Sequence, residues 1–85
     1  MVSSKTRRTH AALFATPTPP DIAWRDVEAL LVALGATLKE GSGSRIRVEL
    51  NGVRMVFHKP HPRPVLVRDA VRSIRRFLTE AGALP

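Results

Sequence analysis

The chain has 85 residues, enough for one small domain, and it has no cysteine, which excludes a disulfide framework and a thiolate metal centre. Its formal net charge is +7, from 14 lysines and arginines against 7 aspartates and glutamates, and this excess favours a polyanionic partner such as nucleic acid. Apolar residues make up 44 %, which argues against a disordered chain, and no apolar run has the ~18 residues of a membrane span.

The first 20 residues are expected to form an arm and a linker. Residues 3–15 favour a short basic helix capped by Ser4, with a frayed tail as the alternative. The prolines of Thr16-Pro17-Thr18-Pro19-Pro20 forbid helix and favour extended backbone, so we expect a linker between this arm and a main domain at residues 21–85. The polar start of the chain has no apolar stretch of the signal-peptide type, and we therefore expect a cytoplasmic protein that does not enter a membrane.

Two amphipathic helices are predicted in the main domain. Residues 22–34 place apolar side chains three and four positions apart, with Asp21 as the cap and Gly35 as a left-handed stop. Residues 65–81 carry a second apolar stripe, and Gly82 ends that helix. Both stripes are expected to face the core.

Three short strands are predicted between these helices, at residues 36–39, 45–50 and 53–57. The second strand alternates apolar and charged residues, so one of its faces is buried and the other is exposed. Asn51-Gly52 is the strongest short hairpin signal, and it joins the second strand to the third. The order predicts an α+β fold of helix, three-stranded antiparallel sheet and helix, with an extra short N-terminal helix.

The turn that runs from Gly41 to Arg45 is the first candidate for binding an anion. Glycines allow a backbone path on which successive amides converge on an anion, and Gly43 and Ser44 supply such a path with a hydroxyl donor. The guanidinium of Arg45 adds a charged fork that suits a phosphate. A loose hairpin turn without a ligand is the alternative.

Two histidines, His58 and His61, lie three residues apart around a proline. Imidazole is the side chain best suited to proton transfer near neutral pH, and RNA cleavage needs a base for the 2′-hydroxyl and an acid for the leaving oxygen. Solvated loop histidines are the alternative. Two histidines without a third ligand make a poor zinc site, so we predict neither a metal nor a cofactor.

Further cations are candidates for contacts with phosphate. They are Arg47 on the second strand, Lys59 after the third, and Arg68 and Arg72 on the last helix. Residues four apart share a helix face, so Arg68, Arg72 and Arg76 predict a basic ridge with Arg75 beside it. Such a ridge suits a phosphate backbone, an acidic protein partner, or simply a solvated surface.

The chain resembles the HicA family of type II toxin–antitoxin toxins over about Trp24 to Ala83. The resemblance is carried by the Gly-Ser turn, the alternating strand, the His-Pro loop, and the final helix with its Ala-Gly ending. It implies a double-stranded-RNA-binding-like fold and a small cytoplasmic ribonuclease that cleaves mRNA without a metal ion. It also implies a HicB-like antitoxin that covers the basic active surface, and it allows a higher-order toxin–antitoxin complex.

One position departs from the family pattern. HicA toxins usually carry Gly-Ser-His, in which the histidine is the catalytic residue at the start of the second strand. Gly43 and Ser44 match that pattern, but Arg45 occupies the histidine position. Arginine is not deprotonated in proteins and so cannot be the usual base, whereas it does bind phosphate and stabilise developing charge.

Three hypotheses follow from this departure. In the first, the protein is an active ribonuclease in which His58 or His61 transfers the proton and Arg45 holds the phosphate. In the second, it is an RNA-binding module with impaired catalysis. In the third, it is an interaction protein whose basic face binds an acidic antitoxin.

Overall fold

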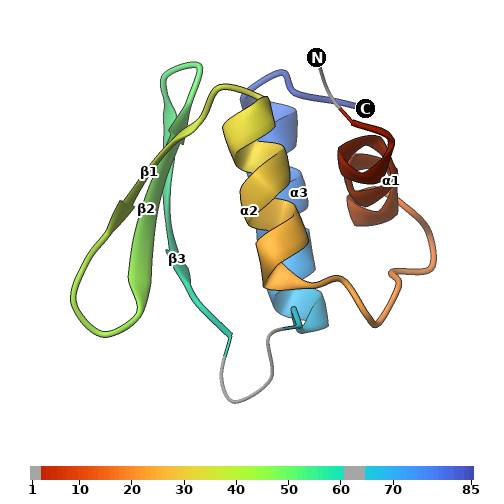
Figure 1. Cartoon of the computed structure of the whole chain (residues 1–85), viewed down its shortest axis with the longest axis horizontal. Helices are drawn as coiled ribbons and strands as arrows, with labels where there is room; N and C mark the ends of the chain where they lie inside the picture. The colour runs from red at the N-terminus through yellow and green to blue at the C-terminus, as the bar shows by residue number, and fades with distance from the viewer. Residues whose placement is uncertain (1–2, 61–64) are drawn as a thin grey trace.

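The computed structural model describes residues 3–60 and 65–85. In chain order the elements are α1 (Ser4–Leu13), α2 (Trp24–Ala33), β1 (Thr37–Glu40), β2 (Arg45–Leu50), β3 (Val53–His58) and α3 (Arg68–Glu80). The strands pair antiparallel in the order β1-β2-β3, and the helices lie on one side of this sheet (Figure 1). The predicted α+β fold, with its double-stranded-RNA-binding-like order and its extra N-terminal helix, is confirmed.

The core lies between the sheet and the helices, and the alternation of β2 sets its position. Ile46, Val48 and Leu50 are buried against the helices, while the residues between them are exposed. Trp24 at the start of α2 stacks on Phe57 of β3 with 4.9 Å between the ring centroids. The inner face of the sheet is therefore apolar, and its charged side chains project from the outer face.

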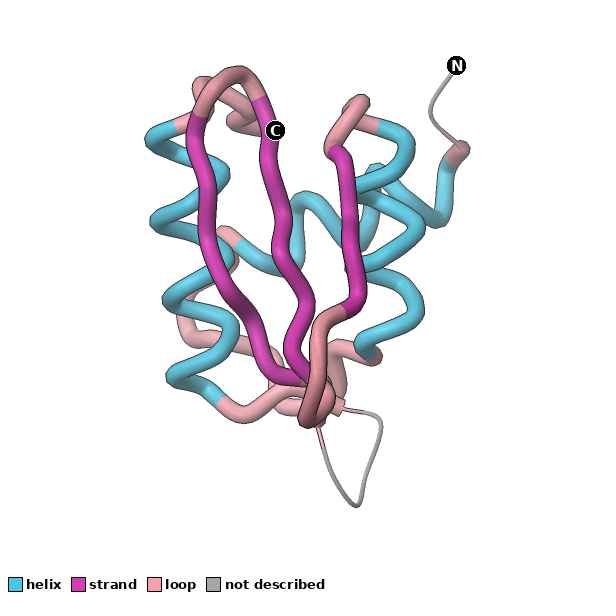
Figure 2. The backbone as a smooth tube through the Cα atoms, turned by 90° about the vertical axis from the view of Figure 1, so that its left-hand side faces the viewer, coloured by secondary structure: helices cyan, strands magenta, loops and turns pink. Residues whose placement is uncertain are grey.

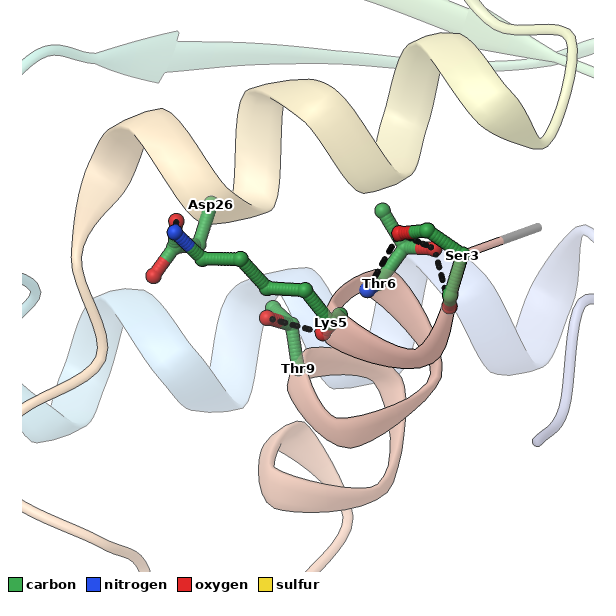
Figure 3. A network of polar contacts seen from close by, with 5 residues as sticks. All are labelled: Ser3, Lys5, Thr6, Thr9 and Asp26. Carbon is green, nitrogen blue, oxygen red and sulfur yellow. Dashed lines mark hydrogen bonds and ion pairs between the residues drawn. The ribbon is translucent and has the colours of Figure 1, made fainter.

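Both predicted caps at the helix starts are wrong. Ser3, rather than Ser4, caps α1, because its hydroxyl oxygen accepts the amide hydrogen of Thr6 at 3.2 Å (Figure 3). Asp21 does not cap α2, which begins at Trp24 after Ala23 and has no side-chain cap.

Both α2 and α3 begin two or three residues later than the sequence predicts, and the two shifts have one physical cause. The amide of Leu66 donates to the carbonyl of Ile22 at 2.9 Å, and Ala23 and Val65 form an antiparallel bridge. The backbone before each helix is thus extended and paired with the other. This contact between distant segments moves the starts from residues 22 and 65 to Trp24 and Arg68.

The turns follow the sequence signals. Asn51 and Gly52 both have positive φ, at 51° and 83°, as the two-residue hairpin requires. Gly35 ends α2 with a φ of 92°, which confirms the predicted left-handed stop. The side-chain amide of Asn51 also donates to the carbonyl of Ala81 at 2.8 Å, so the hairpin is tied to the end of α3.

The N-terminal arm is packed on the helices, on their side away from the sheet (Figure 1). Leu13 is completely buried in the same core cluster as the residues of α2 and α3. The His10 ring donates from Nε2 to the carbonyl of Ala83 at 2.7 Å, and Lys5 reaches across to Asp26 of α2 at 3.4 Å (Figure 3). The arm is therefore an ordered helix, and the alternative of a frayed tail is wrong.

Candidate functional site

The outer face of the sheet carries rows of charged side chains. Figure 2 looks onto this face, with the helices behind it. The antiparallel register places Arg45 opposite His58, and Arg47 opposite both Lys39 and Val56. A further row pairs Glu49 with Arg54, whose Nε lies 3.3 Å from the glutamate carboxylate, and Thr37 completes it.

Among the predicted site residues, Arg45 and His58 lie directly opposite each other on neighbouring strands. They are directly paired across β2 and β3, and both are exposed. Opposite residues in an antiparallel pair have Cβ atoms about 4.5–5.5 Å apart, so the guanidinium and the imidazole can reach the same phosphate group. A fixed positive charge and a proton-transfer group are thus placed side by side at one end of the sheet.

The turn that holds Gly43 and Ser44 is closed against this same end. Gly43 and Ser44 have φ values of 66° and 63°, in the left-handed region that favours glycine. The amide of Gly41 donates to the carbonyl of Arg45 at 2.8 Å, and the amide of Lys59 donates to the carbonyl of Ser44 at 2.9 Å. The turn is therefore anchored to the residue after His58, which fixes the position of Arg45.

The Lys59 side chain is engaged within the protein. Its ammonium forms an ion pair with the carboxylate of Glu40 at the end of β1. This hydrogen bond raises the pKa of Lys59, with only weaker opposition from desolvation, and it lowers the pKa of Glu40, as does the nearby positive charge. In this arrangement Glu40 offsets the charge of a lysine that the sequence predicts to contact phosphate.

The exposed arginines of α3, namely Arg68, Arg72 and Arg76, have different neighbours along the helix. Arg68 lines a groove of about 850 Å³ together with His58 and Lys59. Arg72 is not among the described residues that line this groove. The guanidinium of Arg72 lies 3.7 Å from the carboxylate of Asp69. Arg76 lines a second hollow with Arg54.

Arg75 is directed to the N-terminal arm. Its Nε donates to the carbonyl of Leu13 at 2.7 Å, and its Nη2 donates to the carbonyl of Ala15 at 3.3 Å. The predicted place of Arg75 beside an exposed ridge is wrong, because the arm packs over that side of α3. The ridge reduces to Arg68, Arg72 and Arg76.

The other two histidines, His61 and His10, are not part of the site as the structure describes it. His61 lies outside the described residues, so its role stays a prediction. His10 is buried against Ala83 and Phe14, far along the chain from the site, and it holds the two ends of the chain together.

Sequence reasoning did not select three members of the outer face, namely Lys39, Arg54 and Val56. The sequence does place Arg54 and Val56 on the same face as His58, because every second residue of a strand points to the same face of the sheet. Lys39 lies opposite Arg47. Its position could not be predicted, because the pairing register of β1 with β2 does not follow from the sequence. All three of these residues line a hollow of about 580 Å³.

Over residues 3–60 and 65–85, no group of three or more histidine, aspartate or glutamate side chains is placed to hold a metal ion. Within that same part of the chain, none of the helices combines the length and the apolar character needed to cross a membrane.

Comparison with known protein families identifies a match over most of the chain. The family model described as HicA toxin of bacterial toxin-antitoxin matches residues 24–83. These residues comprise α2, the sheet and α3, so α1 and the proline-rich segment precede the matched part. The chain matches none of the curated proteins and none of the solved structures with which it was compared.

Proposed function

Because this chain belongs to the HicA family and is the toxin component of a bacterial toxin–antitoxin system, we propose that it binds mRNA and cleaves it without a metal ion. Cleavage of mRNA would inhibit translation. The observation that carries this proposal is the pairing of Arg45 with His58 across β2 and β3, beside the closed turn at Gly43 and Ser44.

The proposed reaction uses the 2′-hydroxyl of the RNA as its nucleophile. Neutral His58 takes the proton of the 2′-hydroxyl, the 2′-oxygen bonds to the adjacent phosphorus, and the bond from phosphorus to the 5′-oxygen breaks. The 5′-oxygen takes a proton from water or from His61, and the products are a 2′,3′-cyclic phosphate and a 5′-hydroxyl. Arg45 stays charged throughout and neutralises the phosphate oxygens as their charge grows.

The proposed RNA contacts extend from this pair in two directions. Gly43 and Ser44 lie in the turn before β2 and Arg47 lies on β2, while Lys59 and Arg68 line the adjoining groove. Arg72 is proposed to contact phosphate further along the exposed side of α3. These contacts are mostly charged, so binding should weaken steeply as salt concentration rises.

The family assigns the protein an antitoxin partner of the HicB kind. We propose that this antitoxin is acidic where it meets the basic surface, and that the pair can assemble into a higher-order complex. The proposed substrate is mRNA, which places the action of the toxin in the cytoplasm.

A second function is favoured by one observation, the arginine at position 45. With Arg45 in place of the family's catalytic histidine, the protein would bind RNA and leave it uncleaved. The histidines decide between the two functions, because His58 or His61 would have to supply the proton-transfer group that Arg45 does not.

Induced expression tests the proposal in cells. The unsubstituted chain should arrest growth and deplete mRNA, while His58→Ala should leave both unchanged at equal protein levels. His61→Ala measured in parallel assigns the proton transfer to one imidazole or to both. Normal growth and intact mRNA with the unsubstituted chain would remove the ribonuclease proposal, and salt-dependent RNA binding by that chain would then support the second function.

A further inference from the structure

The outer edge of β3 is open for pairing. With the strand order β1-β2-β3, this strand pairs on one side with β2, and among the described residues no other strand pairs with its second side. Figure 2 shows β3 at the margin of the sheet, with α3 running alongside. An edge strand presents backbone amide and carbonyl groups that are ready to pair with another extended chain.

A groove follows this edge from Arg54 to His58. Its larger part, of about 850 Å³, lies toward His58 and Arg68, and its smaller part, of about 230 Å³, lies toward Arg54 and Glu80. Met55, Val56 and Ser73 line both parts, so the two are continuous.

The groove exposes apolar surface that the core does not use. Val56 is 57 % exposed at the centre of β3, and Val67 is 69 % exposed where α3 begins. Edge strands are usually protected by charged or proline residues, and an exposed valine in the middle of one is a ready contact for a second strand.

The charges that line the groove are mostly positive and favour an acidic occupant. Arg54, Lys59, Arg68 and Arg76 line it together with two carboxylates, of which Asp69 is paired with Arg72 and Glu80 lies at the end near Arg76. No ion pair joins Arg68 or Arg76 to another residue in the described part of the chain, and these two arginines line opposite parts of the groove. Arg54 and Lys59 add two cations that are already paired with carboxylates. An extended segment with carboxylates at both ends would therefore meet a positive charge at each end.

A peptide fits the β3 edge of the groove better than RNA does, although RNA is proposed to contact the groove at its His58 end. Backbone groups of an edge strand pair with a peptide backbone, which RNA lacks. The two phenylalanines that line the groove, Phe57 and Phe77, are buried and offer no face on which a base can stack.

We propose that an extended acidic segment of the antitoxin adds to the sheet as a further strand along β3. This inference rests on the proposed function only in taking the antitoxin as the source of the segment. One end of the groove is lined by His58, Lys59 and Arg68, which are also proposed RNA contacts. A strand bound there would exclude RNA from the Arg45–His58 pair, which makes strand addition a means of neutralising the toxin.

The test uses the full chain and a labelled synthetic peptide as long as β3, in which glutamate and valine alternate. We expect the peptide to bind, to slow hydrogen exchange of the outward-facing β3 amides by at least about tenfold, and to inhibit RNA cleavage. A peptide with lysine in place of glutamate should bind at least about tenfold more weakly. Failure of the acidic peptide to bind, equal binding of both peptides, or protection confined to other elements would overturn the proposal.

Two matched substitutions complete the test. Val56→Glu should weaken peptide binding by at least about tenfold, because it places a carboxylate in the groove against an acidic strand. Val32→Glu introduces the same change at a valine of α2 that is 62 % exposed, and it should leave peptide affinity unchanged. Equal effects of the two substitutions, or protection of the β3 amides by an RNA oligonucleotide instead of the peptide, would contradict strand addition.

The two proposals fail separately. A chain that cleaves RNA but does not bind the peptide loses only the strand-addition inference. A chain that binds the peptide along β3 but does not cleave RNA loses only the ribonuclease proposal.

Discussion

Glu40 determines how much positive charge the candidate site presents. Its carboxylate holds the Lys59 ammonium, and the same hydrogen bond raises the pKa of Lys59 and lowers that of Glu40. Glu40 therefore stays charged below its ordinary pKa of 4.5, and Lys59 stays charged above its ordinary 10.5. Both side chains are ionised throughout the neutral pH range. The Glu40 carboxylate therefore competes with any phosphate for the Lys59 ammonium at neutral pH.

Replacement of Glu40 should strengthen RNA binding. In Glu40→Gln the ammonium of Lys59 loses its ion pair and becomes available to a phosphate, so we expect a several-fold higher affinity and a steeper dependence on salt. Fluorescence anisotropy with a labelled RNA at several salt concentrations measures both quantities.

The control is Glu80→Gln at the far end of α3, which changes the net charge by the same amount. An equal gain in affinity from both substitutions would mean that the whole charge of the molecule, and not Lys59, is responsible. A loss of affinity in Glu40→Gln would show that the ion pair holds the turn in its binding form.

Sequence patterns predict those elements that depend on neighbouring residues. The alternation of β2 and the Asn51-Gly52 turn fixed the faces of the sheet, and a two-residue turn also sets the pairing of Arg45 with His58. The helix starts were missed because the backbone at Ile22 and Ala23 pairs with residues more than 40 positions away.

The part of the site that sequence could not supply also rests on long-range contacts. The pairing of Lys59 with Glu40 and the attachment of Arg75 to the N-terminal arm join residues 19 and about 60 positions apart. No periodicity within a helix or strand reports such contacts, because each depends on how whole elements pack.

The N-terminal helix should contribute to stability although it precedes the residues matched by the family. Leu13 is completely buried between α1 and the other helices, so Leu13→Ala should lower the free energy of unfolding by about 2–5 kcal/mol. Urea denaturation followed by circular dichroism measures this change. Leu84→Ala, at a leucine that is 60 % exposed, is the control and should change stability little. A negligible effect of Leu13→Ala would show that α1 is dispensable for the fold.

The hairpin between β2 and β3 should depend on Asn51 in two separable ways. Asn51 adopts a φ of 51° and its amide donates to the Ala81 carbonyl. Asn51→Gly keeps the turn and loses the hydrogen bond, whereas Asn51→Ala loses both and should cost about 1–2 kcal/mol more. Thermal unfolding of the two variants gives this difference. Equal stabilities would mean that the left-handed backbone carries no strain for alanine.

At the scale of the whole molecule, the candidate site and the N-terminal helix lie on opposite sides. The outer face of the sheet carries the Arg45–His58 pair, and the opposite side of the helices is covered by α1 (Figure 1). The exposed cations of α1, Lys5, Arg7 and Arg8, are thus remote from the sheet. They raise the net charge without adding to the proposed site, which makes them suitable controls for it.

The most direct measurement of the proposed function is cleavage of a synthetic RNA by the purified chain in the presence of a chelator. We predict 2′,3′-cyclic phosphate and 5′-hydroxyl products, a rate at least about 100-fold lower for His58→Ala, and an unchanged rate for Arg8→Ala. An unsubstituted chain that leaves the RNA intact, or a His58→Ala variant that cleaves at the full rate, would contradict catalysis at the Arg45–His58 pair.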